Sequence, residues 1–70
     1  MKMSVNNSKE IEMILKKVFL NVDDVMTLLE CSKSKSYQII SDLNKELEKK
    51  GRVTFHGRVS TSHFRERTQI

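Results

Sequence analysis

The side chains best suited to a chemical role in this sequence are short polar groups and cations gathered in residues 32–41. A lysine can neutralise a DNA phosphate, a glutamine can bond the N6 and N7 edge of adenine, and a serine can bond a base or a phosphate. A tyrosine could place its ring against a sugar and its hydroxyl on a phosphate. The candidates are Ser32, Lys33, Ser34, Lys35, Tyr37, Gln38 and Ser41.

The same segment could also be the solvated start of an ordinary helix, so the neighbouring elements must distinguish the two interpretations. Residues 22–29 have the apolar period of a short helix, and Asn21 is a suitable cap for it. A short turn leads to a second helix, which Ser32 can cap and Gly51 can end. This is the spacing of a helix-turn-helix over residues 22–50, in which the second helix enters the major groove of DNA.

A second group of candidates lies in residues 52–59, which the sequence predicts to be a basic β-hairpin. Valine and phenylalanine favour strands, and a glycine marks a tight turn. A three-residue loop would pair Val53 with Val59, and we favour it because both valines then share one face. A two-residue loop would instead pair Phe55 with Arg58. The hairpin would act as a wing on an adjacent groove or on the phosphates. Its candidate contacts are Arg52, Thr54, His56 and Arg58.

The remaining elements are expected to support this unit. Asn7 fits the cap of an N-terminal helix over residues 7–18, whose apolar face would cover the core, and residues 1–6 would be a flexible start. Phe19 and Leu20 would link it to the next helix. A short last helix over residues 60–67 would begin at a capping serine and be anchored by a phenylalanine.

The composition limits what else the chain could be. Seventy residues are too few for two domains, so we expect a mainly α fold with a small β-hairpin, a single winged helix-turn-helix domain over residues 1–70. One cysteine and two distant histidines do not make a zinc site, and no acids and bases are paired for catalysis. We therefore expect that the protein binds no metal and no cofactor and that it is not an enzyme. No apolar run approaches the roughly 20 residues that span a bilayer, so a cytoplasmic protein is expected.

The charge is distributed unevenly. Residues 1–31 carry four basic and five acidic side chains, whereas residues 32–70 carry nine basic and four acidic ones. A positive surplus confined to one half favours a polyanionic partner, here double-stranded DNA. Lys45, Lys49 and Lys50 lie too far along the second helix for base readout, and we expect them to pair with glutamates or to balance the helix dipole.

The order of these motifs resembles that of the small winged helix-turn-helix proteins of mobile elements in Gram-positive bacteria, the excisionases and short MerR-like regulators. The resemblance implies sequence-specific binding at an attachment site or promoter, cooperative assembly of copies on DNA, DNA bending, and an integrase or recombinase as partner. It also implies a protein of the bacterial cytoplasm that is associated with the nucleoid when bound to DNA. It also leaves open a transcriptional regulator of the same element. The matching positions are Leu20-Asn21-Val22, Val25, Leu28-Leu29, Ser32, Tyr37 and Ile40, followed by the wing at 51–59.

An alternative from another class is a protein-interaction module, such as a phage-type inhibitor or adaptor. It would bind its partner through the apolar face of residues 7–18 or through the helix that Ser32 caps, the third in chain order. Loss of a partner after removal of residues 1–18, with DNA binding intact, would favour a composite role.

Overall fold

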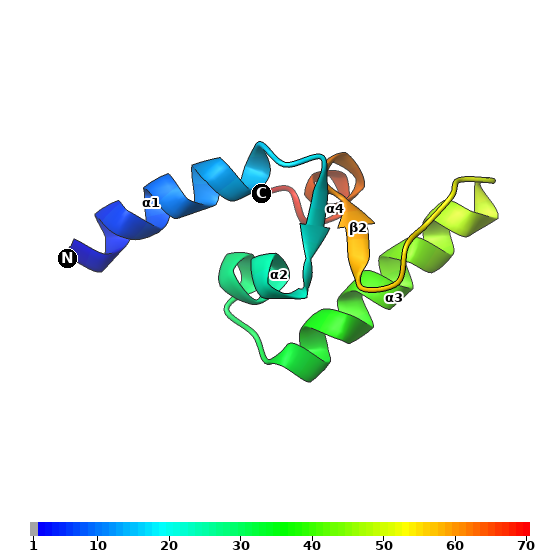
Figure 1. The fold of residues 1–70 in the computed structure, drawn as a ribbon, viewed down its shortest axis with the longest axis horizontal. Helices are drawn as coiled ribbons and strands as arrows, with labels where there is room; N and C mark the ends of the chain where they lie inside the picture. The colour runs from blue at the N-terminus through cyan, green and yellow to red at the C-terminus, as the bar shows by residue number, and fades with distance from the viewer. Residues whose placement is uncertain (1) are drawn as a thin grey trace.

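The structure is a computed structural model that describes the backbone of residues 2–70 and the side chains from Lys9 onward. Within that range the chain forms helices and one pair of short antiparallel strands, as Figure 1 shows. The predicted fold class was mainly α with a small β-hairpin, and it is confirmed as mainly helical with a small antiparallel strand pair. The elements in chain order are α1 (Lys2–Leu15), β1 (Phe19–Asn21), α2 (Val22–Leu29), α3 (Lys33–Lys49), β2 (Arg58–Ser60) and α4 (Thr61–Thr68).

Helix α2 begins at the predicted cap. The side chain of Asn21 accepts a hydrogen bond from the backbone N–H of Asp24 at 2.8 Å, and the Asn21 N–H donates to the Asp24 carboxylate at 3.0 Å. This reciprocal pair satisfies two of the donors that a helix start leaves free. Lys17 places its ammonium 3.1 Å from the same carboxylate, so the end of α1 is tied to the start of α2.

Helix α3 follows α2 after a short turn. Glu30 ends α2 in the left-handed conformation, with φ of 52°. Ser32 caps α3 by accepting from the Lys35 N–H at 3.1 Å, as the sequence predicts. Gly51 follows the end of α3 with φ of +81°, a conformation that glycine adopts without steric cost. Both predicted ends of this helix are therefore confirmed.

The prediction that residues 19–20 only link two helices was wrong. Phe19–Asn21 is a strand that pairs with β2, and the register places Leu20 opposite Val59. Both of these side chains are almost completely buried, whereas their neighbours in each strand point outward. The pairing forms because it buries both apolar side chains on one face of the sheet, which a local pattern of three residues cannot show.

The favoured hairpin register was also wrong. Val53 does not pair with Val59, and its side chain is 80% exposed. A single antiparallel bridge joins Phe55 to Arg58, which is the pairing of the two-residue loop. Since Val59 is needed opposite Leu20, the segment before the turn is left as an irregular loop rather than a strand.

Helix α1 differs from the prediction at both ends. It begins at Lys2 rather than at the expected cap Asn7, so the expected flexible start at 1–6 is helical from its second residue, while Met1 lies outside the described residues. No glycine or proline occurs in this stretch to interrupt the helix. The helix ends at Leu15 instead of Val18, because the chain turns there to enter β1 and leaves Val18 exposed.

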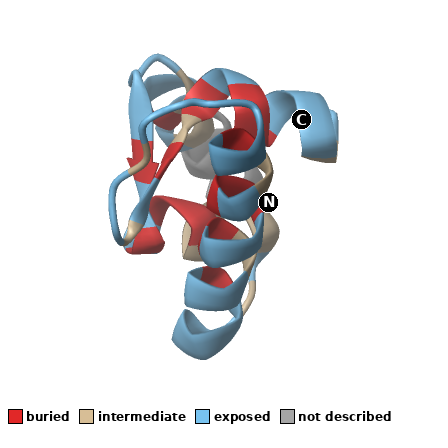
Figure 2. Cartoon of the chain, turned by 90° about the vertical axis from the view of Figure 1, so that its right-hand side faces the viewer, coloured by how far each residue is buried: buried red, intermediate tan, exposed pale blue. Residues whose placement is uncertain are grey.

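The core lies where α2, α3, α4 and the strands meet, and Ile14 near the end of α1 is buried in it (Figure 2). Its most buried apolar side chains are Leu20, Val25, Ile40, Val59 and Phe64. Ser60 caps α4 as expected, and Phe64 anchors that helix in the core with no exposed surface. No helix within residues 2–70 is long and apolar enough to cross a membrane.

Helix α4 is tied to α3 by an ion-pair cluster around Glu46. The His63 Nε2 lies 3.0 Å from one Glu46 oxygen, and the Arg67 Nε lies 3.1 Å from it. Desolvation acts to raise the pKa of Glu46, but the hydrogen bond from His63 and the charge of Arg67 outweigh it and hold that pKa below its ordinary value.

Candidate nucleic-acid interface

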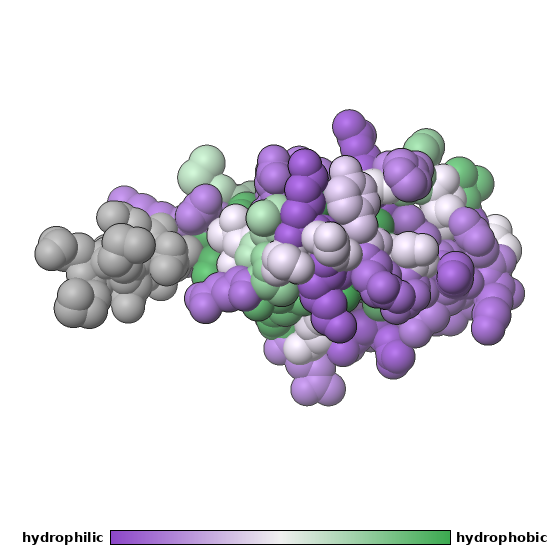
Figure 3. Space-filling view, turned by 90° about the horizontal axis from the view of Figure 1, so that it is seen from below, coloured by the Kyte–Doolittle hydropathy of each residue, from purple (hydrophilic) through white to green (hydrophobic). Residues whose placement is uncertain are grey.

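One face of α3 carries exposed groups that can bond nucleic acid. Ser34, Gln38, Ser41 and Lys45 recur at helical spacing, so they form one stripe along the helix, and all are exposed. The opposite face holds the buried side chains that pack on the core. Viewed from below, the surface over this helix is largely hydrophilic (Figure 3).

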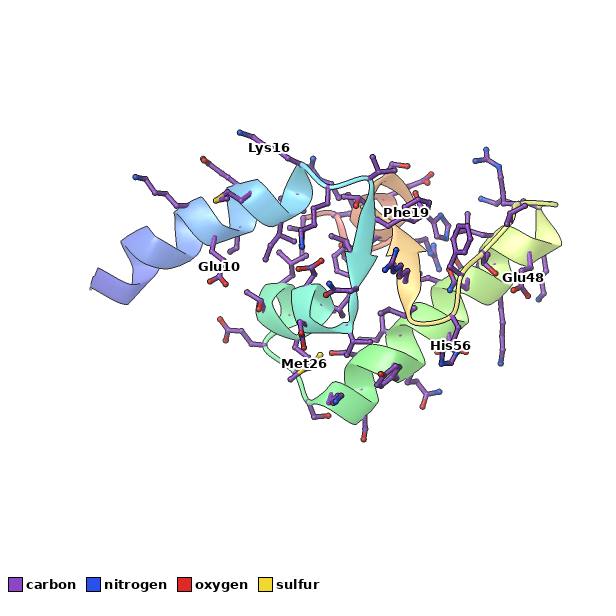
Figure 4. The ribbon with its side chains drawn as sticks, viewed as in Figure 1. Glu10, Lys16, Phe19, Met26, Glu48 and His56 are labelled. Carbon is purple, nitrogen blue, oxygen red and sulfur yellow. The ribbon has the colours of Figure 1, made fainter. Side chains whose placement is uncertain are left out.

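The loop 51–57 lies beside this stripe and forms a groove with it. In Figure 4 the labelled His56 lies alongside the middle of α3, and Glu48 lies closer to the helix end. The groove has a volume of about 280 Å³. Its walls include Tyr37, Ser41 and Lys45 from α3 and Phe55, His56 and Gly57 from the loop.

Two aromatic rings join the walls of the groove. The rings of Tyr37 and His56 are stacked, with centroids 6.3 Å apart and planes at 26°. Gly57 has φ of +75°, and a Cβ at this position would lie 3.9 Å from the Tyr37 ring. The turn therefore approaches α3 closely. Tyr37, predicted as a contact of the recognition helix, and His56, predicted as a contact of the wing, lie together.

Lys33 lies near the other side of this aromatic pair. It lines a second hollow, of about 360 Å³, with Tyr37 and His56 and with Asn21 and Asp23 from the start of α2. This hollow therefore has both a basic and an acidic side chain, Lys33 and Asp23, and both are exposed. The two hollows share Tyr37, His56 and Gly57, so the exposed surface at the first turn of α3 is continuous with the groove.

Lys45 is a residue that the sequence interpretation missed. We expected it to pair with a glutamate, but Glu46 is bonded to His63 and Arg67, and Glu48 accepts a 2.6 Å hydrogen bond from Thr54. Lys45 instead lies on the same stripe as Gln38 and lines the groove. Its separation of seven residues from Gln38 is two helical turns, which was the available signal.

Asn44 was missed as well. It is buried on α3, and its Nδ2 donates to the backbone carbonyls of Phe55 and Arg58. A polar residue within the apolar stripe that contains Ile40 and Leu43 was the only sequence signal.

The structure does not bring every predicted contact into one place. Arg58 is exposed on β2 at the end of the turn, opposite Asn21. Arg52 lines a small hollow toward α4 with Ser62 and His63 instead of the groove. Thr54 lines the groove, but its hydroxyl is already engaged as a donor. Ser32 and Lys35 are both exposed at the start of α3, where the Ser32 hydroxyl serves as the helix cap.

The surface on and beside α3 carries several exposed cations. Lys33, Lys35, Lys45 and Arg58 are exposed on or beside α3, with Asp42 as an exposed acid on the same helix. Among the side chains that the structure describes, no three His, Cys, Asp or Glu residues are grouped so that they could hold a metal ion. The arrangement can therefore bind an anionic polymer through cations, hydroxyls and an amide.

Fold and surface together define a small, mainly helical protein that presents an exposed polar and basic helix face beside a turn. The chain is 35% identical over 52 residues to the ICEBs1 excisionase of Bacillus subtilis (strain 168), and the match covers 74% of this chain and 81% of that protein. The chain therefore belongs to the excisionase family. No protein-family model matches the sequence. No solved structure matches the chain either.

Proposed function

We propose that the protein is a non-catalytic excisionase that binds double-stranded DNA of a mobile element as a winged helix-turn-helix. The observation that carries this proposal is the exposed stripe of α3 beside a turn that is joined to the helix by the Tyr37–His56 stack, in a chain of the excisionase family. A factor of this kind acts by binding and shaping DNA, so it needs no reactive pocket of its own.

In the proposed complex, α3 lies in the major groove, which at about 12 Å wide admits one helix. Gln38 would bond an adenine, and Ser34 and Ser41 would bond bases or phosphates. Lys33, Lys35 and Lys45 would neutralise the backbone on either side of the helix. Their exposure on and beside one helix face supports this assignment.

The loop 51–57 would act as the wing. The groove between it and α3 would receive a single DNA backbone strand, because the sugar-phosphate chain separates the major groove from the minor groove. Tyr37 and His56 would face that strand at the inner end of the groove, and Arg58 would reach phosphates beyond the turn. Arg52 and Thr54 would not read bases, since one lies toward α4 and the hydroxyl of the other is bonded to Glu48.

The proposed partners follow from the family. An integrase or recombinase would act on the same DNA, and several copies of this chain would bind repeated sites there. A regulator of transcription would use the same surface on a promoter. The interaction-module alternative is not favoured, because the family assignment and the polar face of α3 both indicate DNA.

A footprint on the DNA that flanks the coding region tests the proposal. Protected repeats near an attachment site are expected for an excisionase, whereas one site over a promoter would indicate a regulator. With about four to six phosphate contacts, log Kd should change with log salt concentration with a slope magnitude of roughly 4 to 5. An absence of duplex binding even at low salt would overturn the proposal.

A further inference from the structure

Asn44 is a buried amide whose side chain contacts the turn at both ends. Only 8% of its surface is exposed, and it lies on α3 among apolar residues that form the core. Its Nδ2 donates to the carbonyl of Phe55 at 3.1 Å and to the carbonyl of Arg58 at 2.8 Å. The turn between these carbonyls carries the His56 and Gly57 that face Tyr37.

The turn makes one backbone hydrogen bond of its own, from the Arg58 N–H to the Phe55 carbonyl at 3.1 Å. The Asn44 amide therefore connects this hydrogen-bonded turn to the middle of α3. An amide nitrogen has two hydrogens, so one side chain can satisfy both carbonyls. Aspartate offers no donor of this kind, and alanine offers none at all.

The side-chain oxygen of Asn44 is evidence that packing alone does not explain this residue. Its Oδ1 is buried without a hydrogen-bond partner, which destabilises the folded chain. An apolar residue would avoid that cost in the core, but it could not hold the turn. The buried, partly unsatisfied amide thus stands where its nitrogen bonds two carbonyls of the turn.

Few other contacts hold this part of the loop. Val53 is exposed. Phe55 is half-exposed, and its ring makes an edge-to-face contact with the Phe19 ring, with the two centroids 5.6 Å apart. The other contacts of this segment are the Tyr37–His56 stack and the Thr54–Glu48 hydrogen bond, both near the surface, and the pairing of Arg58 with Asn21 in the sheet. Asn44 is the buried polar link between α3 and the turn among the described residues.

We infer that Asn44 is the positioning residue that fixes the turn 55–58 on α3, so that the helix stripe and the wing meet DNA as one rigid surface. Asn44 lines the groove, but only 8% of its surface is exposed and its amide nitrogen is occupied by the two carbonyls of the turn, so its part in this arrangement is to position the turn. The consequence for binding rests on the proposed function, whereas the fixing of the turn is a property of the free protein.

The free protein is tested first, by NMR without DNA. In the unmodified chain, the side-chain amide protons of Asn44 should exchange with deuterium at least tenfold more slowly than those of the exposed Asn21. The heteronuclear NOE of the amides at 56–58 should match that of α3. Fast exchange at Asn44 or a mobile turn would overturn the inference, even if every variant failed to fold.

Variants then separate positioning from stability. Asn44→Ala should lower the NOE of the turn while that of α3 stays unchanged, and Asn44→Asp should do so more strongly by repelling both carbonyls. Ile39→Val on the same helix is the matched control, since it removes one methylene from a half-buried side chain away from the loop. An equal NOE loss in the control, or none in either Asn44 variant, would contradict the inference.

The effect on DNA binding is tested by comparing the Asn44 substitution in the unmodified chain and in an Arg58 variant. Asn44→Ala should weaken duplex binding about fivefold to tenfold in the unmodified chain but less than twofold in an Arg58→Ala background, because the wing contact is already lost. Equal losses in both backgrounds would show that Asn44 does not act through the wing. If no form binds DNA, the proposed function fails, and the NMR result alone decides the role of Asn44.

Discussion

The ring of Tyr37 on α3 stacks on the ring of His56 in the loop, with centroids 6.3 Å apart and planes at 26°. This contact joins the candidate recognition helix to the candidate wing, although the two residues are far apart in the sequence. It lies at the surface, above the buried Asn44 that bonds the same turn. The two contacts together hold one side of the groove.

The first prediction concerns this stack. Tyr37→Ala should weaken duplex binding by about 1 kcal/mol, because aromatic pairs contribute roughly 0.5–1.5 kcal/mol beyond their burial and the turn loses that support. Tyr37→Phe keeps the ring and should bind within twofold of the unmodified chain. Fluorescence anisotropy with a labelled duplex measures both, and Met13→Ala on exposed α1 is the control. If the phenylalanine variant binds as weakly as the alanine variant, the hydroxyl rather than the stack is responsible.

A second prediction separates base reading from phosphate binding on the α3 stripe. Gln38→Ala should cost about 1–3 kcal/mol on the specific site and relax the preference at one base pair. Lys45→Ala should weaken binding to all duplexes alike and reduce the salt-dependence slope by about one. Titrations of a specific and an unrelated duplex at several salt concentrations measure both effects, with the exposed Lys16→Ala on the α1 side as control. A Lys45 variant with an unchanged slope would remove this lysine from the interface.

The strand register can be tested by two matched substitutions. Val59→Thr places a hydroxyl in the core opposite Leu20 and should lower the free energy of unfolding by about 1–3 kcal/mol. Val53→Thr changes a side chain that is 80% exposed and should stay within about 0.5 kcal/mol. Urea unfolding followed by circular dichroism gives both values. Equal losses at both positions would favour the hairpin that the sequence first indicated.

A fourth prediction concerns pH and the link between α3 and α4. The folded chain lowers the pKa of Glu46 from its ordinary 4.5, so this carboxylate stabilises the fold above pH 4.5 and loses that contribution as the pH falls through the lowered value. Glu46→Gln should therefore lower the Tm at neutral pH, and its difference from the unmodified chain should shrink in acid. Thermal unfolding across pH measures this, with the exposed Glu12→Gln as control. A difference that grows in acid would contradict the assignment.

Features that depend on neighbouring residues were predictable from the sequence. The caps at Asn21, Ser32 and Ser60 form bonds to residues three positions further along, so residue type and spacing suffice to predict them. Gly51 ends α3 for an equally local reason, its left-handed backbone. The polar start of α3 was likewise visible as a candidate surface.

Other features depended on contacts between distant parts of the chain. Leu20 pairs with Val59 because both fill one core, and no pattern within either short segment shows that choice. This pairing fixes where the loop ends and which of its residues face α3. As a result Lys45 lines a groove with the loop, and Asn44 bonds the turn.

The sequence by itself thus determined α2, α3 and α4 with their caps and the chemistry of the α3 face, because these follow from interactions within a few residues, whereas both ends of α1 differ from the expected ones. Only the tertiary structure decided the strand pair, the groove and the position of the turn. Their free energy comes from burying Leu20, Val59 and Phe64 together and from two hydrogen bonds of one buried amide, which join segments that the sequence keeps apart.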